Sequence, residues 1–305
     1  MPRANEGTLL ENIVLVEAAR FLSEVTTQGE TIEFLNSFVM PPLSEWRSKE
    51  KDNGMTTEAL KRVATAENAG DGYSGLMKRS LNFSHDVGPN GALLAALTFK
   101  LNQRQGRFWL NDLEESQTRY QDEQFSLGEV ESVAASILSQ TPSNWQVQVC
   151  HQHFPNSLNG LSQTLSQWQG AAARLGYLDP DFFSPKSRDD DSPQTDSASV
   201  RHFLEILGEG FVGPVLSVHF TCHQMGDELA KQVEGLKETG IAAGFESCHF
   251  MHRRFAVVVH SANVPHEFQS AFAQRVNDSW AEWGRIALLR KKPYVLHSFI
   301  GKALV

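Results

Sequence analysis

Cysteine is scarce in this chain, with three residues in 305, and no stretch of about 18 uncharged apolar residues occurs. The scarcity of cysteine argues against a disulfide-stapled secreted scaffold. The missing apolar stretch predicts that the chain has no membrane span. The first residues also lack the basic-then-apolar order of a secretory signal. We therefore expect an intracellular protein, cytoplasmic or nuclear, that does not engage a membrane.

Basic residues are outnumbered, with 27 lysines and arginines against 36 acidic residues and a formal net charge of −9. This balance argues against bulk electrostatic binding of duplex DNA. Glycine-rich phosphate motifs are also missing. The chain has no Gly-x-Gly-x2-Gly fingerprint and no Gly-x4-Gly-Lys-Ser/Thr loop, which argues against nicotinamide and nucleoside-triphosphate chemistry. One segment, residues 285–305, is locally basic: Arg285, Arg290, Lys291, Lys292 and Lys302.

Two regions are expected from the patterning, 1–142 and 143–305. The first is predicted to be mainly helical, because apolar residues recur there at helical spacing. Its helices are expected at 9–25, 56–67, 91–103 and 126–139. The second contains a polar, acidic, proline-containing stretch at 184–199, whose composition predicts a disordered insertion.

Strands and helices are expected to alternate in the second region, so we predict an α+β or mixed α/β fold. From residue 214 the order is β-α-β-β-α-β, which is typical of ferredoxin-like units. A mixed sheet with helices on one face is therefore predicted. Its strands are expected at 145–150, 214–220, 244–250, 254–260 and 293–300, and its helices at 158–175, 200–207, 227–238 and 265–283.

Histidine is concentrated in the second region, which contains ten of the eleven histidines. Each cysteine also directly precedes a histidine at a predicted strand end, in Cys150-His151, Cys222-His223 and Cys248-His249. Strand ends are where open α/β sheets bind ligands. Imidazole is the side chain most readily charged or discharged near neutral pH. The pattern predicts either a metal or thiol site or a histidine acid–base site.

A metal site is the weaker interpretation of these pairs. The spacings match no standard zinc pattern, and adjacent residues of a strand point to opposite faces. Cys222, between a strand and a helix, could be a nucleophile with a stabilised thiolate. Free cysteine is nevertheless among the most buried residue types, so we expect Cys222 to have a packing role.

Two strand-borne histidines offer acid–base chemistry without a metal. His219 and Thr221 share one face of a predicted strand, and His297 lies near the end of the last strand. First and last strands are neighbours in a ferredoxin-like order, so the two imidazoles are expected to approach each other. Such a pair suits cleavage of a phosphodiester by general acid–base catalysis.

The pattern His-x-Thr, helix, hairpin, helix and second strand-borne histidine resembles the 2H phosphoesterases over residues 143–305. The resemblance implies metal-independent attack on phosphodiesters, without a cofactor, by two His-x-Ser/Thr motifs. His219 and Thr221 match the first motif. The second departs from it, because Ser298 directly follows His297. The basic residues Arg254 and Lys292, together with Ser298, are predicted to bind the substrate.

The predicted function is therefore a metal-independent phosphodiesterase-like activity on RNA ends or small cyclic phosphodiesters. Two alternatives stay open. One is a metal- or cysteine-dependent enzyme with its site at the strand ends. The other is a non-catalytic binding or scaffold protein whose helical first region docks a partner. The role of residues 1–142 and the oligomeric state are not predicted.

Overall fold

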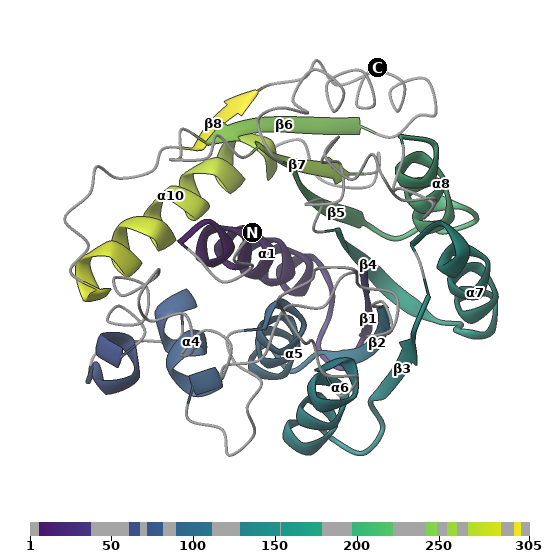
Figure 1. Cartoon of the computed structure of the whole chain (residues 1–305), viewed down its shortest axis with the longest axis horizontal. Helices are drawn as coiled ribbons and strands as arrows, with labels where there is room; N and C mark the ends of the chain where they lie inside the picture. Colours follow the sequence, from purple (N-terminus) through teal and green to yellow (C-terminus); the bar gives the residue numbers. More distant parts are fainter. Residues whose placement is uncertain are drawn as a thin grey trace, which may run out of the picture.

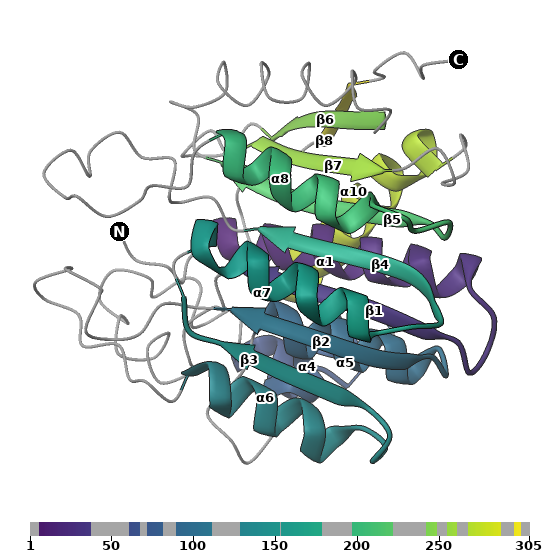
Figure 2. The same ribbon diagram turned by 90° about the vertical axis from the view of Figure 1, so that its right-hand side faces the viewer.

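The computed structural model describes residues 6–37, 61–67, 72–81, 90–111, 129–152, 154–178, 197–221, 242–248, 255–260, 268–287 and 296–299. Eight strands form one sheet, and helices lie on both of its faces (Figures 1 and 2). None of the described helices is both long and apolar enough to cross a membrane.

Five parallel strands make up the larger part of the sheet, in the order β3-β2-β1-β4-β5. The chain starts at the centre with β1 and moves outward to β2 and β3. It then returns to the other side of β1 to form β4 and β5. The topological switch point thus lies between β1 and β4. The bounds are β1 Thr31–Ser37, β2 Gln105–Asn111, β3 Gln146–Cys150, β4 Ala171–Leu178 and β5 Val215–Thr221.

Three further strands extend the sheet beyond β5, in the order β7-β6-β8. Strand β7 (Phe255–His260) is antiparallel to β5, β6 (Ala242–Cys248) is antiparallel to β7, and β8 (Leu296–Phe299) is antiparallel to β6. Strand β6 therefore runs in the direction of β5, with the reversed strand β7 between them.

The helices form two layers, one on each face of the sheet (Figure 1). On one face are α1 (Glu6–Val25), α4 (Tyr73–Leu81), α5 (Gly91–Leu101), α6 (Glu129–Gln140) and α10 (Phe268–Ala287). On the other are α7 (Phe154–Gln167) and α8 (Ser197–Gly208). Residues 61–65 are also helical.

Strand alternation divides the core between these two layers. In β1, Ile32 and Phe34 pack with α1 and α5, whereas Leu35 packs with α7 and α8. Both faces of the central strands are covered, so their apolar residues are buried without a simple polar–apolar alternation. The same division applies to β2, where Phe108 faces one layer and Trp109 the other.

The predicted ferredoxin-like fold with a helical first region is wrong. Residues 1–142 contribute two central strands, β1 and β2, and the helices cover both faces. The sequence order β-α-β-β-α-β does occur from β5 to β8. The place beside β5 that a ferredoxin-like unit gives to its last strand is, however, taken by β4, and β8 pairs with β6 instead.

The predicted helix at 158–175 is also wrong over its second half. Helix α7 ends at Gln167, and Gly170 adopts a positive φ of 76°. A glycine is favoured there because other residues are strained at positive φ. The chain then enters β4, which is rich in alanine and leucine. These residues favour helices, and for that reason the sequence predicts a helix there.

Other predicted elements agree with the structure to within a few residues. These are α1, α5, α6, β3, α8, β5, the strands β6 and β7, α10 and β8. The predicted helix at 227–238, residues 56–60 and most of the 184–199 insertion lie outside the described residues. The last part of that insertion begins α8 at Ser197.

A buried carboxylate links the three central strands. Glu33 in β1 is fully buried and stands directly opposite Arg107 in β2 and Arg174 in β4. Arg174 donates to Glu33 over 2.8 Å, and Arg107 Nη1 lies 3.5 Å from its other oxygen. Burial raises the pKa of Glu33, and the two guanidinium groups oppose that rise.

The two arginines have further contacts that hold them in place. Arg174 donates to the carbonyl oxygen of Leu207 over 3.0 Å and stacks on Phe211, with 4.2 Å to the ring centroid. Arg107 donates to the carbonyl oxygen of Gln169 over 2.8 Å. The charged cluster of Glu33, Arg107 and Arg174 is thus held in place by contacts with the chain just before β4 and β5.

Another arginine, Arg104, closes the carboxyl end of α1. The last carbonyls of a helix have no partner within the helix. Arg104 donates to the carbonyl oxygen of Ser23 over 2.6 Å and to that of Thr26 over 2.8 Å. Because Arg104 directly precedes β2, this contact fixes α1 relative to the sheet.

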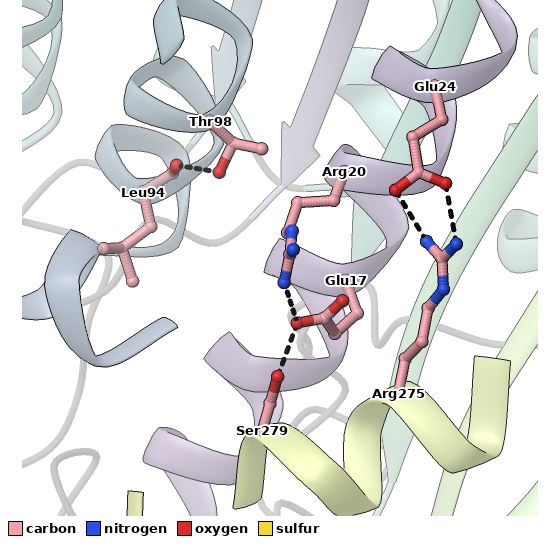
Figure 3. A network of polar contacts seen from close by, with 7 residues as sticks. All are labelled: Glu17, Arg20, Glu24, Leu94, Thr98, Arg275 and Ser279. Atoms are coloured by element: carbon pink, nitrogen blue, oxygen red, sulfur yellow. Dashed lines mark hydrogen bonds and ion pairs between the residues drawn. The ribbon is translucent and has the colours of Figure 1, made fainter. Parts of the chain in front are cut away.

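Helix α10 docks on α1 through polar contacts (Figure 3). Ser279 donates to the buried carboxylate of Glu17 over 2.6 Å, and Arg20 donates to the same oxygen over 3.0 Å. Toward the end of α1, Arg275 makes two hydrogen bonds to Glu24, of 2.9 and 2.7 Å. These contacts join the first and last described helices.

Replacement of Arg174 by methionine should destabilise the protein in a pH-dependent way. The variant leaves the Glu33 carboxylate buried with Arg107 alone, so its pKa should rise further above that of the unfolded chain, about 4.3. A raised pKa in the folded state means that stability is lost as pH rises through it. We expect a loss of about 3 kcal/mol near pH 7 and a smaller loss near pH 5.

Urea unfolding followed by circular dichroism at both pH values measures this. The double variant Arg174→Met with Glu33→Gln is the control, since it lacks the titrating group. A loss that is equal at the two pH values in the single variant would contradict the role assigned to Glu33.

Candidate functional site at the carboxyl ends of the parallel strands

The carboxyl ends of β1, β2 and β4 meet at one edge of the sheet, beside the switch point. Open α/β sheets bind ligands at this position. Buried polar residues end the strands: Asn36 and Ser37 in β1 and Asn111 in β2. Each is at most 1% exposed, so its polar atoms need partners within the protein or from a ligand.

Asn111 organises one side of this edge. Its amide nitrogen donates to Ser37 Oγ over 3.1 Å and to the carbonyl oxygen of Gln152 over 3.0 Å. Its amide oxygen accepts from the backbone N–H of Gln152 over 3.2 Å. The side chain therefore ties the end of β1 to the segment that follows β3.

Asn36 lies on the opposite face of β1. Strand alternation places it with Phe34, on the side of α1 and α5, and it stands directly opposite Tyr177 of β4. Its amide oxygen is buried and has no hydrogen-bond partner among the described residues. An unsatisfied buried acceptor costs about 1–3 kcal/mol. Its position at the carboxyl edge makes it a candidate contact for a ligand.

Helix α5 begins beside the same edge and is tightly packed there. The Asn90 side chain caps it, accepting from the N–H groups of Ala92 and Leu93 over 2.9 and 3.4 Å. A Cβ on Gly91 would lie 2.8 Å from Leu15 Cδ2 and 3.2 Å from Asn12 Oδ1. Glycine is required at this close approach of α5 to α1.

Two residues of the predicted Cys-His pairs lie at the end of β3. The His151 ring contacts the Glu131 carboxylate of α6, with 2.5 Å between Nε2 and Oε1. Burial raises the pKa of the Cys150 thiol. A raised pKa disfavours the thiolate, so Cys150 lacks the activation that a nucleophile needs.

Within the described residues, no three His, Cys, Asp or Glu side chains come together as a metal site would require. The residues of the second region that lie outside the described part of the chain include four histidines and one cysteine: His153, Cys222, His223, His249 and His252.

The two predicted catalytic histidines belong to strands that are not neighbours. His219 and Thr221 are in β5, whereas His297 and Ser298 are in β8. Strands β7 and β6 lie between them. Three inter-strand steps amount to about 14 Å. His219 and His297 are therefore not on adjacent strands, as the expected approach of their imidazoles requires. The predicted substrate-binding residues Arg254 and Lys292 lie outside the described residues.

The polar residues of the observed edge were missed by the sequence reasoning. Both β1 (Thr-Ile-Glu-Phe-Leu-Asn-Ser) and β2 (Gln-Gly-Arg-Phe-Trp-Leu-Asn) contain a short apolar run that is followed by asparagine. That shared ending is the signal that could have identified Asn36 and Asn111. Neither run has the alternation that would predict a strand from the sequence.

Fold and candidate site together define a doubly wound α/β protein with buried polar residues at the carboxyl ends of its parallel strands. No family model matches the sequence, and no curated protein matches it. Over nearly the whole length, the fold is similar to that of the protein LPL1258 of Legionella pneumophila, described only by the family model DUF519. The two share 12% identity at a TM-score of 0.57, over 97% of this chain and 98% of the other.

Two further solved structures are more distant. A candidate spermidine synthase of Corynebacterium glutamicum has a TM-score of 0.42 at 11% identity, over 97% of this chain and 76% of that protein. A candidate rRNA methylase of Clostridium thermocellum has a TM-score of 0.35 at 11% identity, over 79% and 94%. The likeness to the Legionella protein concerns the fold alone, and the other two are too low to support an argument.

The resemblance to 2H phosphoesterases is thereby corrected. The sheet is not the ferredoxin-like sheet that the resemblance implies, and the fold similarity to the Legionella protein extends over 97% of this chain. The strand order also separates the two halves of the supposed histidine site. That prediction rested on the short His-x-Thr motif, which occurs readily by chance, together with the order of the following elements and a second strand-borne histidine.

Replacement of Asn111 by alanine should destabilise the protein, because Ser37 and the backbone of Gln152 lose buried partners. We expect a loss of about 2–3 kcal/mol in the free energy of unfolding, measured by urea denaturation. Asn102→Ala, which removes one partly buried hydrogen bond to Thr98, is the matched control and should cost about 1 kcal/mol or less. Equal losses in the two variants would contradict the network.

Proposed function

We propose that this protein is a group-transfer enzyme of the methyltransferase type, which binds S-adenosylmethionine at the carboxyl edge of β1, β2 and β4. The strand order is the observation that carries the proposal. The dinucleotide-binding Rossmann order is 3-2-1-4-5-6. Here the reversed strand β7 stands between β5 and β6. That insertion is typical of methyltransferases that use this donor.

The chemistry of the edge fits such a donor. S-adenosylmethionine has an ammonium group and ribose hydroxyls, both of which donate hydrogen bonds. The orphaned Asn36 oxygen is a buried acceptor suited to one of these groups. Ser37, oriented by Asn111, offers a hydroxyl on the other face of β1. When bound, the cofactor supplies a methyl group activated by its sulfonium sulfur.

A nicotinamide dinucleotide fits less well. Its pyrophosphate is bound by a glycine-rich turn that leads into a helix N-terminus, and the chain lacks the Gly-x-Gly-x2-Gly fingerprint. The first free N–H groups of α5 are already occupied by the Asn90 cap. The edge thus favours a ligand that donates hydrogen bonds over one that brings two phosphates.

Isothermal titration calorimetry with S-adenosylhomocysteine and with NADH tests the proposal on the purified chain. We expect binding of the former and none of the latter. Binding of NADH alone, or of neither compound, would overturn it.

The variant Asn36→Leu locates the site. It should weaken S-adenosylhomocysteine binding about tenfold, as expected for one lost hydrogen bond. It should not lower the melting temperature of the unliganded protein, because an unsatisfied buried oxygen is removed. Ser74→Ala is the matched control. It also removes a buried oxygen that lacks a partner among the described residues, but on α4, and should leave binding unchanged. Unchanged binding in Asn36→Leu would exclude Asn36 from the site.

A further inference from the structure

Strand β3 forms one edge of the described sheet and lacks the charge, proline and bulge that commonly protect such an edge. Within the described residues it pairs only with β2. Edge strands are commonly protected by charge, proline, bulges or short length. Residues Gln146–Cys150 read Gln-Val-Gln-Val-Cys, with no charge and no proline. They also pair with β2 in an unbroken register.

The opposite edge differs. Strand β8 has four residues, and the sequence before it is Arg290-Lys291-Lys292-Pro293. Charge, proline and short length are all present there. The contrast indicates that β3 is an edge adapted to accept another strand.

The sequence of β3 is suited to pairing with itself. In an antiparallel pair about a two-fold axis through Gln148, each Val147 faces Val149 of the partner subunit. Gln148 then faces its own copy, and no like charges meet. Val147 and Val149 are half-buried against the core beneath α6, whereas Gln146 and Gln148 are exposed on the other face. One face of the joined strands would then carry the valines, and on the other face the amide side chains of the two Gln148 residues would meet.

Helix α6, which packs beside β3 at the same end of the sheet (Figure 2), adds to this surface. Its outer side carries the exposed residues Ala135 and Leu138, the latter 47% exposed. A stable interface needs about 1,200 Å² of buried surface or more, which five residues of strand cannot supply alone. The proposed interface therefore also requires contacts from the neighbouring surface of α6.

We propose that two copies of this chain associate through antiparallel pairing of β3 with β3, which continues the sheet across a two-fold axis. Such an interface is isologous and closed, so it yields a dimer and no filament. The surface lies at the outer edge of the sheet, two strands away from the switch point between β1 and β4. Its occupation is independent of the proposed ligand.

Sedimentation velocity of the full chain over a concentration series tests the dimer. The wild-type protein should associate reversibly. Gln148→Lys and Gln148→Glu should each be monomeric, because like charges would face each other across the axis. An equimolar mixture of the two variants should restore the dimer, since opposite charges then meet.

Gln163→Glu is the matched control, because it makes the same charge change at an exposed position of α7 and should stay dimeric. Gln148 is exposed, so its variants should fold, which circular dichroism checks. A wild-type chain that is monomeric at every concentration overturns the proposal. So does a dimer that persists in both single variants, or a mixture that fails to associate.

Discussion

The buried carboxylate of Glu33 is the interaction on which the rest of this structure most depends. It stands between two arginines from the neighbouring strands, at directly opposed positions of β2 and β4. A slip of one residue would move every side chain of a strand to the other face. It would also separate Glu33 from Arg107 and Arg174 and leave charges buried without partners, which is costly. The cluster therefore selects one register for the three strands that end at the ligand edge.

The geometry of that edge follows from this register. With β1 fixed, Asn36 faces the layer of α1 and α5, and Ser37 faces Asn111 on the other side. Arg104 holds the end of α1 against the start of β2, and α10 is fixed to α1 through Glu17 and Ser279. The polar atoms at the carboxyl edge are thus placed by rigid elements. Rigid placement is what a binding site needs in order to hold a ligand without a large ordering cost.

Elements with regular periodicity were predictable from the sequence. Helix α10 and strands β5 and β7 each have an apolar pattern that can be recognised within the element itself. Strands β1 and β4 are different. Glu33 interrupts an otherwise apolar run in β1, and Ala171–Leu178 is rich in residues that favour helices. In both, burial on two faces of a central strand overrides local preference, because tertiary packing outweighs propensity.

The site could be predicted only in part. The expectation that chemistry lies at strand ends stays a prediction, and the choice of His219 and His297 rested on a strand order that the structure does not have. The roles of Asn36 and Asn111 depend on the residues that surround them. Asn36 has a buried acceptor without a partner among the described residues, and Asn111 is the centre of a hydrogen-bond network. Neither property is visible in a single residue.

The sequence by itself determined which segments are helices with one apolar side, where most of the later strands lie, and which phosphate-binding motifs the chain lacks. The tertiary structure alone decided which strands are neighbours, and with that which side chains meet. The physical reason is that the hydrogen bonds of a sheet join backbone groups that are alike in nearly every residue. Pairing is therefore selected by what each face buries across distant parts of the chain, as with Glu33, Arg107 and Arg174.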